Sequence, residues 1–199
     1  MSKASEDTRA YIIAQAAELF NQKGFSATSI ADVMQVTGLQ KGGIYNHFKS
    51  KEELAIAAFD YAVTLKQKRY HSVLRSSSKC LVRLFNFIDL FCQEPDTPSL
   101  KGGCPIMNTA IEHDAVKVEL LDRAKSAMDH WRAFLCKIIA RGIAHQEIQA
   151  SVYPDEVATL IIATLEGGLM MSQLYDDRTY LDRAALHLKQ HLQTLAAAS

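Results

Sequence analysis

The chain has 199 residues, 48% hydrophobic and 22% charged, which is enough to bury one large core or two small ones. Its formal net charge is zero, which excludes binding of nucleic acid through overall basicity. The start MSKASEDTRA is polar, and no uninterrupted apolar run approaches the roughly 18 residues of a membrane span, so we expect a cytoplasmic protein. The four cysteines lack CxxC spacing, so we expect reduced thiols and no structural metal.

Strand signals are nearly absent, whereas apolar residues recur with the 3.6-residue period of amphipathic helices. Thr28 or Ser29 can cap one short helix, and Gly38 ends it after about two turns. Short helices are marginal alone, so those near the N-terminus need a larger helix as a packing surface. We predict an all-α chain of about nine helices. Besides the short helix that ends at Gly38, these lie near residues 8–23, 41–48, 51–74, 81–91, 106–113, 116–145, 154–175 and 180–195.

The stretch GLQKGGIYNHF, residues 38–48, places Gly42 and Gly43 side by side within a predicted helix. A glycine inside a helix costs about 0.5–1 kcal/mol relative to alanine. Two explanations are open. Either the glycines relieve crowding at a tight helix corner, or a partner approaches the helix backbone so closely that side chains would obstruct it.

Two short helices separated by residues 37–40 form a helix-turn-helix pattern, which by itself is common in helical proteins. The polar side chains of the second helix favour DNA: Gln40 and Asn46 match the edge of adenine, and Lys41 matches guanine. Ile44 and Phe48, four residues apart, are expected to anchor this helix to the core. Donors suited to phosphate oxygens are also present: Tyr45, His47, Lys49, Ser50 and Lys51.

The block ATSIADVMQVTGLQKGGIYNHFKSKEELAIAAF, residues 27–59, resembles the DNA-binding domain of the TetR family of transcriptional regulators. One position departs from the family pattern: relatives often carry Thr, Ser or Ala where this chain has Gly43, so base reading is expected to fall more on its neighbours. The resemblance is carried by Thr28, Gly38, Lys41-Gly42, Ile44-Tyr45, Phe48 and the run KSKEEL at residues 49–54.

This resemblance implies a homodimeric repressor that a small molecule releases from a palindromic double-stranded operator, with no cofactor, catalytic residue or membrane partner. Residues 1–50 would bind DNA, and residues 51–199 would sense ligand and dimerise, with the helix at 51–75 connecting the two. The dimer would form through the helices at 154–175 and 180–195. The implied phosphate contacts are Thr28, Tyr45, Lys49 and Lys51, and the implied base-facing residues are Gln40, Lys41, Gly43 and Asn46.

The helices between residues 81 and 175 carry aromatic and methionine side chains that are candidates for lining a ligand pocket, although such stripes usually belong to the core. We expect an apolar or aromatic inducer. The candidate ligand-binding residues are Phe85, Ile88, Cys104, Met107, Asn108, Ile111, Trp131, Phe134, Glu166 and Met170.

Two alternatives remain open at this point. Cys104 precedes Pro105 near the expected start of a helix, where the helix dipole lowers a thiol pKa, so it is either a sensor of oxidants and electrophiles or a packed cysteine. A helical enzyme or carrier would instead centre on Glu112, His113 and Asp114. The chain shows no nucleophile motif or phosphate-binding loop, so we do not expect an enzyme.

Overall fold

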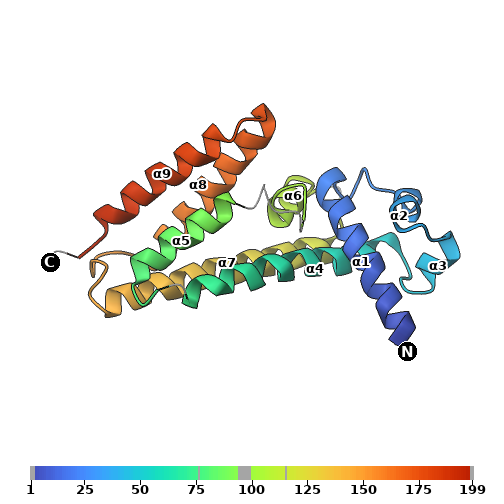
Figure 1. The fold of residues 1–199 in the computed structure, drawn as a ribbon, viewed down its shortest axis with the longest axis horizontal. Coiled ribbons are helices and arrows are strands. Elements are labelled where there is room, and N and C mark those ends of the chain that lie inside the picture. Colours follow the sequence, from blue (N-terminus) through green and yellow to red (C-terminus); the bar gives the residue numbers. More distant parts are fainter. Residues whose placement is uncertain (1–2, 76, 94–99, 115, 198–199) are drawn as a thin grey trace. The chain divides into compact units, whose positions relative to one another are not determined.

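The computed structural model describes residues 3–75, 77–93, 100–114 and 116–197 (Figure 1). Within these ranges the chain is helical and has no β-strand, which confirms the predicted all-α fold. The helices are α1 (Lys3–Lys23), α2 (Ile30–Thr37), α3 (Lys41–Tyr45), α4 (Lys51–His71), the 3₁₀ helix η1 (Ser72–Arg75), α5 (Cys80–Cys92), α6 (Pro105–Ile111), α7 (Val118–Ala144), α8 (Pro154–Tyr175) and α9 (Thr179–Thr194).

Three helix boundaries differ from the prediction by three residues or more. The first helix begins at Lys3 rather than near residue 8, so the chain's polar start is helical. The third ends at Tyr45, after which the His47 N–H bonds to the Ile44 carbonyl, three residues back instead of four. The fourth ends at His71 and tightens into η1 instead of continuing.

Local capping chemistry sets both ends of α2. Ser29, not Thr28, is the N-cap: its side chain accepts from the Asp32 N–H, and the Asp32 carboxylate accepts from the Ser29 N–H, which completes a capping box. At the other end Gly38 adopts a left-handed conformation with φ of 71°. The chain therefore turns sharply before Gln40, the N-cap of α3.

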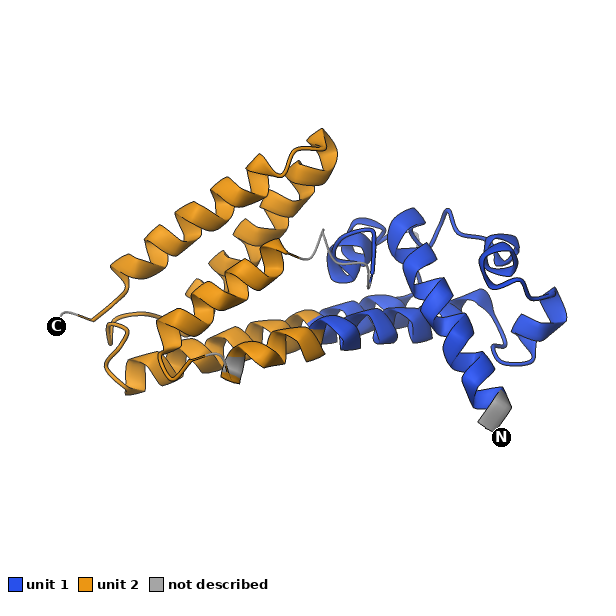
Figure 2. Cartoon of the chain, in the orientation of Figure 1, with its two compact units in different colours: residues 1–66, 97–127 blue, residues 67–96, 128–199 orange. Residues whose placement is uncertain are grey.

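The described chain forms two compact units (Figure 2). Unit 1 comprises residues 1–66 and 97–127, and unit 2 comprises residues 67–96 and 128–199, so both units take residues from α4 and α7. The division into two units reflects how the helices pack. The expected boundary at residue 50 instead separates a DNA-binding part from a ligand-sensing and dimerising part, and it stays a prediction.

The core of unit 1 holds α1, α2, α3 and the start of α4 together. Ile44 and Phe48 are 1% exposed, which confirms them as the anchors of the third helix. They pack with buried residues of the neighbouring helices, among them Ile12, Ala16, Val33 and Leu54.

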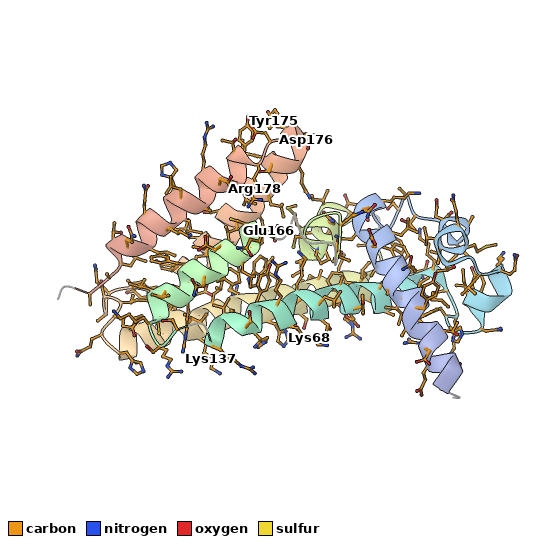
Figure 3. All side chains as sticks on the ribbon, viewed as in Figure 1. Lys68, Lys137, Glu166, Tyr175, Asp176 and Arg178 are labelled. Atoms are coloured by element: carbon orange, nitrogen blue, oxygen red, sulfur yellow. The ribbon has the colours of Figure 1, made fainter. Side chains whose placement is uncertain are left out.

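Unit 2 is built on the packing of α8 against α9 and of α5 against α9. A Cβ at Gly168 would lie only 2.9 Å from the Ala184 Cβ, so α8 and α9 approach closely through this glycine. Figure 3 marks Tyr175, Asp176 and Arg178 at the turn between the two helices.

By length and composition alone α8 could cross a membrane, which the sequence-based expectation did not allow for. One such helix is weak evidence, because core helices of soluble proteins have the same length and composition. Here one face of α8 is buried within unit 2, including Ile161, Leu165 and Leu169.

Candidate nucleic-acid interface

The turn between α2 and α3 presents a polar surface around the N-terminus of α3. Gln40, Lys41, Asn46 and Lys49 are exposed, and Tyr45 is 41% exposed although it is a large aromatic residue. Gly43, His47 and Lys51 are half-buried beside them. Donors suited to bases and to phosphates therefore share one exposed segment of the chain.

Thr28 is placed differently from the other residues of the predicted set. Its side chain is 1% exposed, and its hydroxyl donates to the Gly24 carbonyl over 2.7 Å. In this conformation Thr28 closes the turn after α1 and its hydroxyl is not available to a phosphate. We therefore leave it out of the proposed contact set.

Crowding within the chain does not explain the glycine pair of α3. A Cβ placed on Gly42 would meet nothing within 4 Å, and one on Gly43 would meet only the Leu39 Cβ, at an ordinary 3.7 Å. Neither glycine has a positive φ, in contrast to Gly38. Alanine would therefore fit both positions and would favour the helix. Of the two explanations that the sequence left open, crowding at the helix corner has no support among the described residues.

Aromatic rings lie close to the lysine side chains around α3. Lys41 Nζ lies 5.9 Å from the centre of the Tyr45 ring, and Lys51 Nζ lies 4.2 Å from that of Phe25. These cation–π contacts hold the charges near the protein surface without neutralising them.

The Asp32 carboxylate lies on the neighbouring helix, where it pairs with Lys23 over 2.9 Å. Hydrogen bonds from Ser29, then the contact with Lys23, hold the pKa of Asp32 well below its usual range. The carboxylate therefore stays ionised at neutral pH, where it serves the cap of α2.

Side chains of α6 attach this helix to α1 within unit 1, a contact that sequence patterns did not reveal. The Asn108 amide donates to the Gly102 carbonyl over 2.8 Å and to the Asn21 carbonyl over 2.9 Å. The Asn21 amide donates to the Lys101 carbonyl over 2.7 Å. The Glu112 carboxylate accepts from the N–H of Phe25 over 2.6 Å. We call this set, Asn21, Asn108 and Glu112 with their backbone partners, the α1–α6 clamp.

The three residues on which an enzyme would centre lie in different surroundings. Glu112 is bound to the turn after α1, where it accepts from Ser26 as well as Phe25. His113 and Asp114 contact each other at the exposed surface. The three side chains do not converge on an enclosed site.

The predicted ligand residues are distributed over both units. Cys104, Met107, Asn108 and Ile111 belong to unit 1, whereas Phe85, Ile88, Trp131, Phe134, Glu166 and Met170 belong to unit 2. Ile111 is 71% exposed and Met170 is 47% exposed, so we leave both out of the proposed ligand site. Unit 1 has a small cavity of about 40 Å³ lined by α1, α4 and α6, and Asn108 is the predicted residue at its wall.

The cysteines of the chain are mostly enclosed. Cys104 is the N-cap residue of α6, as expected, but it is 3% exposed. Burial raises the pKa of the Cys92 thiol to about 11, and it also raises the pKa values of Cys80 and Cys136. These environments disfavour the thiolates of Cys80, Cys92 and Cys136. Among the described residues no cluster of His, Cys, Asp and Glu has the arrangement of a metal site.

A second exposed surface lies along α8. Leu160, Gly167, Met171 and Leu174 recur at helical spacing on the side of α8 that is not buried in unit 2. Leu174 is 72% exposed, and a Cβ on Gly167 would meet nothing within 4 Å. A contiguous apolar stripe of this kind marks an interaction surface. We call these four residues, with Ala163 and Met170, the α8 stripe.

Two family models match the chain over most of its length. One, described as "Bacterial regulatory proteins, tetR family", matches residues 12–58, and the other, described as "Tetracyclin repressor-like, C-terminal domain", matches residues 80–188. The chain therefore belongs to the TetR family of bacterial transcriptional regulators, as its sequence indicated. Its helix-turn-helix is the DNA-binding part of such a regulator.

Two solved structures and one sequence relative agree with this assignment. A TetR transcriptional regulator from Chloroflexus aurantiacus J-10-FL is 40% identical, covers 100% of both chains and has a TM-score of 0.94. A TetR-family regulator from Cytophaga hutchinsonii is 30% identical over 100% of both chains, with a TM-score of 0.92. The HTH-type transcriptional repressor DhaR of Mycobacterium sp. (strain GP1) is 26% identical over 185 residues, which are 90% of this chain and 89% of that one.

Proposed function

We propose that the chain is a homodimeric repressor that binds a palindromic operator through α3 and leaves it when a small molecule binds. Its relative DhaR is named a transcriptional repressor, which supports repression over activation. We expect the protein to act in the cytoplasm, where both the operator and a metabolic inducer are available.

The observation that carries this proposal is the open space around Gly42 and Gly43. Helix stability favours alanine at both positions, and nothing in the folded chain requires glycine there. Bare backbone at the N-terminus of a recognition helix allows it to approach the DNA closely in the major groove. Gln40, Lys41 and Asn46 would then reach base edges, while Tyr45, His47, Lys49 and Lys51 would contact phosphates.

The α8 stripe supports the dimer. In a twofold dimer the same surface meets its own copy, and a row of leucine and methionine with a central glycine is self-complementary. Two recognition helices would then read half-sites separated by about one turn of DNA, or 34–36 Å.

The α1–α6 clamp supports a route from ligand to DNA. Through the clamp, α6 holds the end of α1 and the turn that leads into α2. A ligand that changes the position of α6 would therefore change how α1 and the following turn hold the helix-turn-helix formed by α2 and α3. The ligand can shift this equilibrium only by its difference in affinity for the two arrangements; a 100-fold weakening of operator binding needs about 2.7 kcal/mol.

The first test is selection of binding sites from random duplex DNA, followed by anisotropy titrations over a salt series. We expect a palindromic site and an affinity that falls steeply with salt. Lys49→Gln should flatten the salt slope by about two units, because each of the two protomers loses one phosphate contact. Lys125→Gln is the matched control, since this exposed lysine lies outside the proposed contact set and pairs with Asp122. Failure to recover any site from the selection would contradict the proposal.

A further inference from the structure

Trp131 is the only tryptophan of the chain, and it lies among aromatic side chains of unit 2. Its ring is nearly parallel to those of Tyr70 and Phe91, with centroids 6.1 and 5.9 Å away and interplanar angles of 8° and 16°. The Phe87 ring is tilted against it, with a centroid distance of 6.2 Å. Trp131 is 8% exposed, and Phe87 and Phe91 are at most 1% exposed. The tryptophan is therefore enclosed by flat apolar surfaces.

The indole N–H of Trp131 is buried and has no hydrogen-bond partner among the residues that the structure describes. A buried donor without an acceptor costs about 1–3 kcal/mol, and the N–H of a buried tryptophan usually finds a partner. A water molecule would need two to four polar groups around it; of the three rings against Trp131, Phe87 and Phe91 provide none and Tyr70 provides one hydroxyl. The group that would satisfy this N–H is a hydrogen-bond acceptor carried by an otherwise apolar molecule.

We propose that Trp131 anchors the inducer, and that the inducer is an uncharged planar aromatic compound with a carbonyl-type oxygen. The oxygen accepts from Trp131 Nε1, and the flat ring packs against the surrounding aromatic side chains. An anion does not fit, because negatively polarised ring faces cannot replace the hydration that its charge loses, and a cationic group has no lone pair to accept from the indole N–H. The inference rests on the ligand response of the proposed function and names the chemistry of the ligand.

Entry of this ligand requires the ring cluster to rearrange, since Phe87 and Phe91 are fully enclosed. The liganded unit 2 is therefore a different arrangement from the one described here. A ligand that binds only the rearranged state can shift the population toward it. Its apparent affinity is reduced by the small fraction of molecules that are open at any time.

The first test follows the single indole N–H signal of the ¹⁵N-labelled wild-type protein by NMR. The probes are 1-indanone and indane, two bicyclic compounds of similar shape that differ in one carbonyl group. A new hydrogen bond to Nε1 moves the indole proton downfield, so 1-indanone should produce a downfield shift that indane does not. An indole signal that does not move with 1-indanone up to its solubility limit overturns the proposal.

The second test compares affinities by calorimetry in the wild type and in Trp131→Phe, which keeps an aromatic ring and removes the donor. For each protein we take the dissociation constant of indane divided by that of 1-indanone. The decisive quantity is this ratio in the wild type divided by the same ratio in Trp131→Phe, because differences in hydrophobicity between the two compounds then cancel. We expect this quotient to favour indanone in the wild type by about three- to tenfold. A quotient of one overturns the assignment of the donor.

Operator binding is measured separately on the same wild-type protein, so failure of the two proposals can be told apart. If the indole signal responds to 1-indanone but no DNA site is selected, the ligand assignment stands and the regulator proposal fails. If DNA binds and the indole signal is unaffected, the ligand assignment alone is wrong.

Discussion

Glycine is required by the backbone conformation at Gly38 but not at Gly42, and stability measurements on alanine variants can show this difference. Gly38 has φ of 71°, which strains any residue with a Cβ, whereas Gly42 is helical and surrounded by open space. We predict that Gly38→Ala lowers the free energy of unfolding by about 1 kcal/mol. Gly42→Ala should instead raise it by about 0.5–1 kcal/mol. Urea denaturation of both variants checks the opposite signs, and a loss of stability in Gly42→Ala would show that the glycine serves the fold.

Residue-level patterns predicted what depends on near neighbours in the sequence. The cap at Thr28 or Ser29, the stop at Gly38 and the burial of Ile44 followed from spacing within one or two helical turns. The burial of Thr28 did not, because its hydroxyl turns inward to the Gly24 carbonyl instead of capping α2. Whether a Cβ fits at Gly42 also depends on packing in three dimensions.

At the scale of helices, the α1–α6 clamp makes a testable contribution to stability. Glu112→Ala leaves the N–H groups of Phe25 and Ser26 without their acceptor, so we predict a loss of about 1–2 kcal/mol in the free energy of unfolding. Glu112→Gln keeps one acceptor oxygen and should lose less. Amide exchange at Phe25 and Ser26 should accelerate in the alanine variant. Unchanged exchange at both amides would rule out this role for the carboxylate.

Gly102 offers an independent test of the same clamp. Its φ is 98°, and a Cβ there would collide with the backbone of Asn21 at the end of α1. Gly102→Ala should therefore separate the loop before α6 from α1 and lower the melting temperature. Gly42→Ala is the control, because that position is helical and open and lies outside both the clamp and the α8 stripe. Equal melting temperatures in the two variants would contradict the close approach.

Helix positions were predictable from periodicity, but helix partners were not. The range 154–175 was predicted as observed, because Pro154 and acidic first-turn residues mark its start. The clamp joins residues 80 or more positions apart, and no pattern within one helix indicates such a contact. The same limit explains why Ile111 and Met170 were predicted to line a pocket but lie at the surface.

For the whole molecule, the proposed dimer depends on the α8 stripe. Leu174 is 72% exposed, so Leu174→Glu should leave the fold of unit 2 intact while placing two like charges in an apolar interface. We predict a shift from dimer to monomer in analytical ultracentrifugation, with an unchanged helical circular dichroism spectrum. Gln173→Glu adds the same charge at an exposed position beside the stripe and should remain dimeric. A dimeric Leu174→Glu would place the interface elsewhere.

The whole-molecule function was indicated by one short motif, because recognition of DNA requires particular side chains at fixed places on one helix. The ligand was not, since an apolar ligand site uses the same aromatic residues as an ordinary core. The unpartnered N–H of Trp131 is a feature that an ordinary core would not have, and it becomes visible in the folded chain.

The most direct measurement of the central claim is the operator affinity of Gly42→Ala compared with the wild type, on the selected site at fixed salt. Because the fold has room for this methyl group, any loss of affinity must come from the partner. We predict binding weaker by about tenfold or more, in a protein at least as stable as the wild type. Unchanged affinity would mean that DNA does not approach the backbone of α3 at this glycine, and the proposed docking would be wrong.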